Sequence, residues 1–330
     1  MCIRDRCKAW GPPESLVYED VPSPMPGPGQ VKIAVKAAGM NFPDTLLIEG
    51  KYQMKPPFPF APGAEAAGTV IAVGPGVTRF RIGDKIMGTS ATGSGGYAEE
   101  MIAGENSAQP IPDGMTWEQA AGFAAVYGTS YHALVQRAHL AAGETLLVLG
   151  AAGGVGLAAV ELGKAMGATV IGAVGADEKF AVVLEHGADH VINYTTGSLK
   201  DQVKALTADK GADVIYDAVG GDMFDQSMRC IAWEGRLLVV GFASGRIPSL
   251  PANLALLKGC QIVGVFYGAF AAREPETATA NFAAMARLFA AGKLRPHVSK
   301  TFPLKDAPHA MRELLTRKYP GKLVLTMDAA

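Results

Sequence analysis

The sequence predicts an α/β protein in which a region built around a parallel sheet interrupts a β-rich region. From residue 144 onward, short apolar strands alternate with helical patterns, which is typical of a parallel sheet that binds its ligand at the carboxyl ends of the strands. Residues 7–120 instead hold short strands between many glycine and proline breaks. A last apolar strand, Lys322–Thr326, is expected to rejoin the N-terminal sheet.

The composition excludes several classes of partner. The chain has 330 residues, which is enough for two domains, and 18% of them are charged, with a formal net charge of -1. Without a basic excess there is no electrostatic case for nucleic acid or an acidic membrane, and the apolar stretch 146–160 is too short to span a bilayer. We therefore expect a small-molecule partner.

The cysteines and the first residues bear on the compartment. Cys2, Cys7, Cys230 and Cys260 contain no C-x-x-C pair and no even framework of the secreted kind, so we expect a reducing cytoplasm. Residues 1–6 lack the apolar core of a signal peptide. They also fit poorly as the start of a strand, and we interpret them as a cloning or sequence-assembly remnant.

The β-rich region contains one short helix whose start carries polar groups. The pattern predicts strands at 16–18 and 31–38, followed by a helix that Asn41 is suited to cap. After residue 110 the pattern changes to two helices, 117–125 and 128–135.

The most informative stretch is a glycine-rich turn between a strand at 145–149 and a helix. Gly153 and Gly154 have no side chains, so the backbone can approach a pyrophosphate that faces the free N–H groups of the new helix. A second strand at 169–174 completes a βαβ unit. Ala151 replaces the first glycine of the usual fingerprint, which reads A-x-G-x-x-G here. The context nevertheless predicts a dinucleotide site.

Further strands extend this sheet. They are predicted at 191–192, 214–217, 235–240 and 261–266. Beyond residue 270, amphipathic helices are expected around Met285 and Met311.

Several spaced motifs resemble the medium-chain dehydrogenase/reductase superfamily, and within it the zinc-free NADPH:quinone oxidoreductases that include zeta-crystallin. The matching runs lie in order at residues 37–44, 62–68, 83–85, 95–99, 127–129 and 151–156. An alanine at the first glycine position is usual in that branch. The resemblance covers the chain from Cys7 to Thr326.

The resemblance implies a GroES-like β-barrel domain formed by both chain ends and an inserted Rossmann domain with a doubly wound parallel sheet. On this basis we expect the GroES-like catalytic domain at 1–124 and 268–330, and the Rossmann NADPH-binding domain at 125–267. Nicotinamide and substrate are expected to meet in a cleft between them.

A metal site is not expected. Zinc-dependent relatives place a cysteine where this chain has Met40 or Asn41, and a histidine where it has Ala64. The four closely spaced cysteines that hold structural zinc are also missing, and the six histidines form no H-x-x-x-H pair.

The end of the second strand of the parallel sheet favours NADPH. An NAD site has a carboxylate there, whereas this chain has apolar residues and glycine at 174–176. The resemblance implies that Lys179 contacts the 2′-phosphate, with Tyr194 beside it and Arg317 as a third contact. Asp177 and Glu178 oppose a phosphate, so the preference is expected to be incomplete. The alternative is that Lys179 is a solvated residue opening a helix.

The resemblance also implies a larger set of cofactor contacts. Asn41 and Thr129 are expected to bond the nicotinamide carboxamide or ribose, although each could instead cap a helix. Besides Lys179, Tyr194 and Arg317, the expected contacts are Asn41, Thr129, Ala152, Gly153, Gly154, Val155, Gly175, Gly241, Phe242, Ala243 and Phe266.

Three residues are candidates for catalysis. Tyr52 and Asn41 are expected to orient the acceptor oxygen or donate a hydrogen bond to it, and Asp44 to hold that loop. Tyr52 follows Gly50 and precedes prolines, so we expect it to be exposed, and surface packing is its alternative role. Water can protonate a quinol anion, so a dedicated acid is not required.

The sequence thus predicts hydride transfer from NADPH to a quinone by a cytoplasmic enzyme. Two alternatives remain open, namely reduction of an activated C=C bond in an enone or enoyl thioester, and NADPH binding without catalysis. Homodimerisation is expected through edge strands near 261–266.

Overall fold

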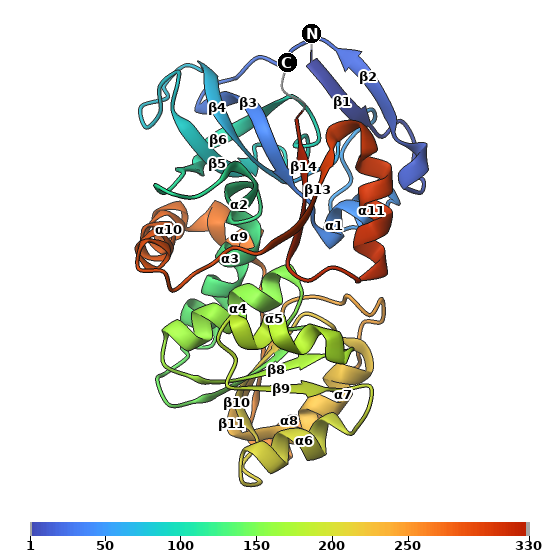
Figure 1. The fold of residues 1–330 in the computed structure, drawn as a ribbon, viewed down its shortest axis with the longest axis vertical. Helices are drawn as coiled ribbons and strands as arrows, with labels where there is room; N and C mark the ends of the chain where they lie inside the picture. Colours follow the sequence, from blue (N-terminus) through green and yellow to red (C-terminus); the bar gives the residue numbers. More distant parts are fainter. Residues whose placement is uncertain (1, 328–330) are drawn as a thin grey trace. The chain divides into compact units, whose positions relative to one another are not determined.

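The computed structural model describes residues 2–327, which fold as two compact units (Figure 1). The first unit comprises the chain up to Ala125, Pro275–Phe282 and the chain from Pro296 onward. The second unit comprises Val126–Glu274 and Ala283–Arg295.

The first unit is built on a six-stranded sheet in the order β13-β14-β3-β4-β5-β6. β3 also pairs with β6, so four of the strands close on themselves as a barrel. The last strand, β14, pairs antiparallel with β3, which confirms the expectation that it rejoins the N-terminal sheet. The strands are β3 (Gln30–Gly39), β4 (Glu65–Val73), β5 (Lys85–Ser90), β6 (Glu100–Pro110), β13 (Val298–Pro303) and β14 (Lys322–Thr326).

The expectation for the first residues was wrong in one respect. Residues 2–6 form a strand, β1 (Cys2–Arg6), which pairs antiparallel with β2 (Val17–Val21). Cys2 and Asp5 are buried, and the Asp5 N–H donates to the Tyr97 carbonyl at 3.1 Å. Backbone pairing and burial therefore stabilise a strand that the residue types did not suggest. Met1 lies outside the described residues.

The helices of the first unit are short. The predicted helix at 117–125 is divided in two, because α2 ends at Ala121 with Gly122 as its C-cap, and α3 begins at Ala124. A Cβ at Gly122 would lie 3.1 Å from Cγ of Lys322, so the glycine leaves room for that side chain. The elements are η1 (Pro13–Ser15), α1 (Phe42–Ile48), α2 (Trp117–Ala121), η4 (Leu304–Asp306) and α11 (Ala307–Thr316). Helix α3 (Ala124–Tyr131) begins in this stretch, and its residues from Val126 onward belong to the second unit.

The second unit contains the predicted parallel sheet. Its order is β12-β11-β10-β7-β8-β9 and every neighbouring pair is parallel, which is the doubly wound arrangement. The predicted strand at 261–266 ends at Gly264, and Phe266 instead precedes helix α9 (Tyr267–Arg273). The strands are β7 (Thr145–Leu149), β8 (Thr169–Val174), β9 (His190–Asn193), β10 (Ala212–Asp217), β11 (Ile231–Val239) and β12 (Gln261–Gly264).

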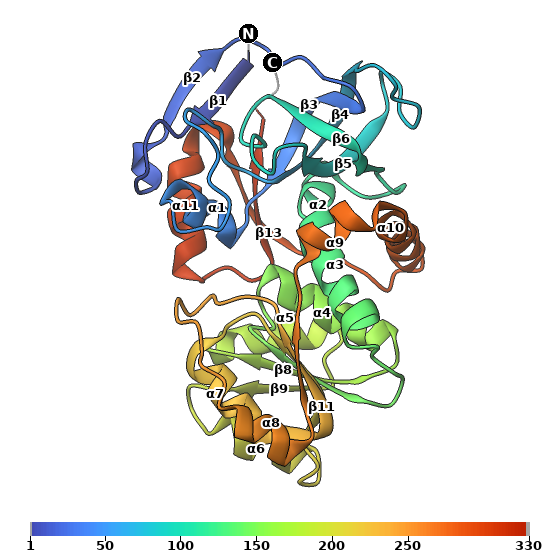
Figure 2. The ribbon, with the colours of Figure 1, turned by 180° about the vertical axis from the view of Figure 1, so that it is seen from behind.

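Helices cover both faces of this sheet, as Figure 2 shows from behind. On one face, a Cβ at Gly163 of α4 would touch Leu146 and Val170. On the other face, Leu147 and Ile171 share a core with residues of α6 and α7. The helices are α4 (Gly154–Ala165), α5 (Phe180–Glu185), α6 (Leu199–Leu206), α7 (Gly221–Cys230) and α8 (Ala252–Lys258), with the further segments η2 (His132–Arg137) and η3 (Asp177–Lys179). Helix α10 (Pro275–Ala290) is divided between the two units after Phe282.

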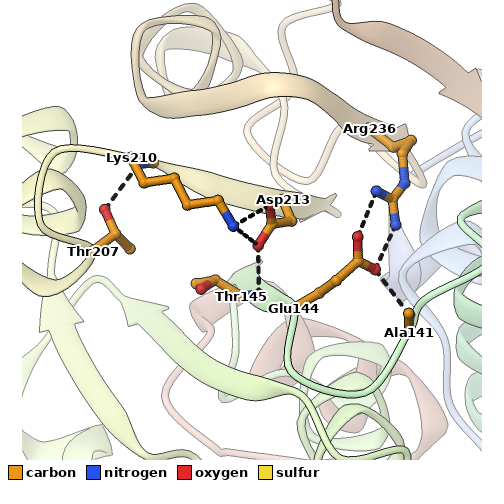
Figure 3. Close-up of polar contacts among 8 residues, drawn as sticks. Ala141, Glu144, Thr145, Thr207, Lys210, Asp213 and Arg236 are labelled. Carbon is orange, nitrogen blue, oxygen red and sulfur yellow. Dashed lines mark hydrogen bonds and ion pairs between the residues drawn. The ribbon is translucent and has the colours of Figure 1, made fainter.

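Hydrogen bonds and ion pairs of charged side chains connect β7, β10 and β11 near the amino edge of the sheet (Figure 3). The Arg236 guanidinium donates to both carboxylate oxygens of Glu144, at 2.8 and 2.6 Å. Asp213 accepts from the Thr145 N–H at 2.9 Å and from Lys210 Nζ at 3.0 Å. The hydrogen bonds from Arg236 also lower the pKa of the Glu144 carboxyl. These contacts occupy the amino edge of the sheet. Ligands of such sheets bind at the opposite edge, at the carboxyl ends of the strands.

No helix among residues 2–327 is both long and apolar enough to cross a membrane.

Candidate functional site

The glycine-rich turn lies between β7 and α4 at the carboxyl edge of the parallel sheet. Gly150 ends the strand with φ 70°, and its carbonyl accepts the Gly153 N–H at 2.9 Å, which closes the turn. Gly153 is the N-cap of α4 and is exposed. As a glycine it offers no side chain to the first N–H groups of the helix, so these donors are suited to an anion.

Close packing inside the turn explains its residue types. A Cβ at Gly156 would lie 2.2 Å from the Gly150 carbonyl oxygen, so only glycine fits there. Ala151 is fully buried, and its methyl group faces Gly172 of β8, where a Cβ would lie 3.2 Å away. The absent side chain at Gly172 therefore makes room for alanine at the first position of the fingerprint.

The carboxyl ends of β8 and β9 bring two of the predicted residues together. A Cβ at Gly175 would lie 3.0 Å from the Tyr194 hydroxyl, so the two residues are neighbours. Lys179 follows in η3 and is half-buried. Asp177, one of the two acidic residues expected to oppose a phosphate, accepts a hydrogen bond from Asn193 Nδ2 at 2.7 Å. Part of its hydrogen-bonding capacity is thus used within the protein.

Gly154 and Val155 begin α4, whereas Gly241, Phe242, Ala243 and Phe266 lie on loops after the strands. The Gly241 and Ala243 N–H groups donate to the carbonyls of Asp217 and Ala218, which ties this loop to the end of β10. Phe266 is 66% exposed. Thr129 is half-buried inside α3 and not at its start, so the alternative that it caps a helix was wrong.

The first unit holds Asn41, Asp44, Tyr52 and Arg317. Asn41 is the N-cap of α1, as the spacing predicted, and its N–H donates to Asp44 Oδ2 at 2.8 Å. Tyr52 is half-buried against the core, so the expectation of an exposed side chain was wrong. Arg317 is exposed after α11 in a left-handed backbone conformation, φ 57°. Each unit therefore contains some of the predicted site residues.

Sequence reasoning missed two functional candidates next to Asn41. Lys322 Nζ donates to Asn41 Oδ1 at 2.8 Å and to Glu65 Oε1 at 3.0 Å, and Asn41 Nδ2 donates to the same Glu65 oxygen at 2.9 Å. Glu65 lies in a motif that was noted, and Lys322 opens an apolar strand. A lysine at the start of a strand expected to be buried is the signal that could have revealed the pair.

Burial dominates the electrostatics of this region. Loss of water raises the pKa of Asp44 to about 6, against hydrogen bonds from the Asn41 N–H and the Tyr97 hydroxyl that lower it. Burial and the nearby Asp44 carboxylate also raise the pKa of Tyr52. Tyr52 therefore keeps its phenolic proton at neutral pH and is available as a hydrogen-bond donor.

Asp44→Asn is expected to change the pH dependence of stability. Because the pKa is raised on folding from its ordinary value of 3.8 to about 6, the folded state binds more protons between those values. The stabilisation of the folded state that comes from this extra proton binding is fully present below pH 3.8 and is lost as the pH rises through about 6. The unfolding free energy of the variant minus that of the wild type should therefore increase by roughly 3 kcal/mol between about pH 4 and about pH 8. Urea unfolding across this range measures it.

Asp84→Asn is the matched control. Asp84 Oδ2 accepts from the Arg81 N–H, three residues earlier, just as Asp44 accepts from Asn41, but its side chain is 33% exposed. The prediction would be contradicted if the unfolding free energy of Asp44→Asn relative to the wild type did not change with pH. It would also be contradicted if this value changed equally in both variants.

No group of three histidine, cysteine or acidic side chains within residues 2–327 is arranged to hold a metal ion.

Comparison with known proteins gives consistent matches. Residues 27–113 match the alcohol dehydrogenase GroES-like domain, and residues 154–287 match the zinc-binding dehydrogenase family. The chain is 44% identical to a quinone oxidoreductase-like protein 2 homolog of Nematostella vectensis over 97% of its own length and 87% of that protein. 

Solved structures agree with these matches. A quinone oxidoreductase from Pseudomonas syringae pv. Tomato is 33% identical with a TM-score of 0.92, over 99% of this chain and 100% of that one. The Escherichia coli quinone oxidoreductase, complexed with NADPH, is 30% identical with a TM-score of 0.91, over 98% of this chain and 99% of that one.

Proposed function

Because the chain belongs to the quinone oxidoreductase family of the medium-chain dehydrogenase/reductase superfamily, we propose that it uses NADPH to reduce a quinone without the help of zinc. The observation that carries the proposal is the carboxyl edge of the parallel sheet. There the turn before α4 exposes Gly153, and the end of β8 offers Lys179 in place of a carboxylate at 174–176.

The residues of the second unit fit this cofactor. The start of α4 presents backbone N–H donors without a side-chain cap, which suits the pyrophosphate. Gly175 and Tyr194 are neighbours at the carboxyl ends of β8 and β9, and Lys179 follows four residues after Gly175. We infer that Lys179 binds the 2′-phosphate, with Arg317 as a further contact. We further infer that Thr129, Ala152, Gly154 and Val155 contact the cofactor, together with Gly241, Phe242, Ala243 and Phe266.

The chemical step needs little from the protein beyond orientation. NADPH supplies the hydride when bound. Asn41 holds the nicotinamide or the acceptor oxygen through its remaining amide hydrogen, and Tyr52 donates a hydrogen bond to the acceptor from a phenol that stays protonated. Asp44 fixes the start of α1 and thereby the position of Asn41. The quinol anion that hydride transfer produces takes its proton from water.

Zinc independence is part of the proposal. Met40 and Ala64 offer no metal ligand, and Glu65 already accepts from Lys322, Asn41 and the Ala125 N–H. The ammonium group supplies the positive charge that this carboxylate requires. We assign residues 1–124 and 268–330 to catalysis and residues 125–267 to NADPH binding.

Turnover with a panel of acceptors tests the proposal. Purified protein with NADPH should reduce 1,4-benzoquinone and 9,10-phenanthrenequinone faster than 1-octen-3-one or an acrylyl thioester, measured as NADPH oxidation. Preferred reduction of the enone or the thioester would favour a C=C reductase. Tight NADPH binding with no turnover of any acceptor would refute catalysis.

Lys179→Gln is expected to weaken selectivity for NADPH. A hydrogen bond to a charged group contributes about 1.5–3 kcal/mol, so the ratio of kcat/KM for NADPH over NADH should fall roughly ten- to hundredfold. Lys210→Gln is the control, because that lysine bonds Asp213 at the opposite edge of the sheet. An unchanged ratio would identify Lys179 as an ordinary solvated residue.

We also propose a homodimer that pairs along β12, in the cytosol. β12 is an edge strand of its sheet, and Leu256, Leu257 and Phe266 nearby are 79%, 67% and 66% exposed. The four unpaired thiols suit a reducing compartment. Sedimentation at micromolar concentration tests the dimer, and a monomer would refute it.

A further inference from the structure

Two buried charged side chains, those of Lys322 and Glu65, form hydrogen bonds with Asn41 that the reaction described above does not use. The side chains of Lys322 and Glu65 are only 7% and 1% exposed, and their Nζ and Oε1 atoms lie 3.0 Å apart. Lys322 Nζ also donates to the Met40 carbonyl at 2.6 Å and to Asn41 Oδ1 at 2.8 Å. Its three protons thus meet three acceptors.

This set fixes which way the Asn41 amide faces. The carbonyl oxygen of the amide faces an ammonium group, and its nitrogen faces the Glu65 carboxylate. The reverse orientation would place an N–H group against Lys322 and an oxygen against Glu65, and both contacts would be repulsive. One amide hydrogen of Asn41 remains for a ligand.

Packing holds both charged groups in place. Glu65 Oε2 accepts the Ala125 N–H at 2.8 Å. The aliphatic part of Lys322 lies against Gly122, and a Cβ at Gly39 would lie 2.7 Å from Glu65 Oε1 and 2.2 Å from the Ala121 carbonyl oxygen. These glycines leave the space that the ion pair fills, and a larger residue at either position would push into it.

We propose that Lys322 is a positioning residue that, together with Glu65, orients and polarises the Asn41 carboxamide for the reaction. The proposal rests on the proposed function of Asn41. A cation on the amide oxygen and an anion on its nitrogen draw charge along the amide, which strengthens the remaining N–H as a donor. Lys322 does not act as an acid, because none of its protons is left for a substrate.

A mutant cycle tests the coupling between Lys322 and Asn41. Lys322→Met alone would leave Glu65 buried without its partner, so the informative variant is Lys322→Met/Glu65→Gln, which removes both charges. We expect kcat/KM for quinone reduction to fall on the order of 100-fold, and we expect the same loss for Asn41→Ala. Adding Asn41→Ala to the double variant should cause little further loss.

Independent losses would overturn the proposal. If the triple variant shows the product of the separate losses, or if the double variant keeps full activity, Lys322 has only a structural role. The control is Lys32→Met/Glu100→Gln, which neutralises an ion pair of 3.4 Å in the same unit with side chains 11% and 19% exposed. It should leave kcat/KM unchanged.

A crystal structure of the double variant separates this proposal from the proposed function. The Asn41 side chain is expected to change its rotamer or to occupy two conformations once the charged partners are gone. An Asn41 side chain that stays in place would overturn the positioning role, whatever the enzyme does. A released Asn41 in a protein whose wild type reduces no quinone would support the positioning role and refute the proposed reaction.

Discussion

Lys322→Met alone is expected to lower the free energy of unfolding by about 3–5 kcal/mol, because it leaves the Glu65 carboxylate buried without a cation. Glu65 is fully buried and keeps only neutral donors, the Asn41 amide and the Ala125 N–H. Urea unfolding in the absence of NADPH measures the change.

The double variant Lys322→Met/Glu65→Gln should recover most of that stability, since replacing both members of a buried pair by neutral groups is often close to neutral. Lys8→Met is the control. Lys8 also pairs with a glutamate, Glu19, at 2.7 Å, but its side chain is 50% exposed, so its loss should cost little. Equal and small losses in Lys322→Met and Lys8→Met would show that Glu65 does not depend on its cation.

Gly156→Ala is expected to disrupt the turn before α4. Its Cβ would lie 2.2 Å from the Gly150 carbonyl oxygen and 2.8 Å from Cα of Ala151, so helix and strand must move apart. Overpacking of this kind typically costs about 1–3 kcal/mol of stability. Displacement of the helix start by about 1 Å should lower kcat/KM on the order of 100-fold. Urea unfolding and NADPH titration measure the two effects.

Gly153→Ala separates the two effects. A Cβ at Gly153 would meet the Gly150 oxygen at 3.4 Å, an ordinary contact, and its φ of -78° suits alanine. The variant should therefore fold normally but bind NADPH more weakly, because the methyl group would lie where the pyrophosphate approaches the backbone. Normal NADPH affinity in Gly153→Ala would argue against this turn as the pyrophosphate site.

Local patterns in the sequence were sufficient to predict the second unit. The glycine turn, the helix after it and the strands at 145–149 and 169–174 follow from neighbouring residues, because strand and helix periodicities are local properties. The parallel sheet then follows from their alternation. The Asn41 cap was likewise predicted from its spacing to the helix.

Features that depend on distant residues could not be predicted in this way. Lys322 and Asn41 are 281 positions apart, and only the pairing of β14 with β3 brings them together. The strand at Cys2–Arg6 depends on its partner β2 and not on its own residue types. Thr129 lies inside a helix because the break falls at Gly122, where the side chain of Lys322 needs space.

The place of β14 in the first sheet has a consequence for biosynthesis. A chain growing on the ribosome completes residues 126–274 before it reaches Lys322, so the parallel sheet can form first. Until the last strand emerges, β3 lacks one neighbour and the Glu65 carboxylate lacks its cation. Completion of the first sheet is therefore a late event, and a nascent chain stalled before residue 322 should remain sensitive to proteases in the first unit.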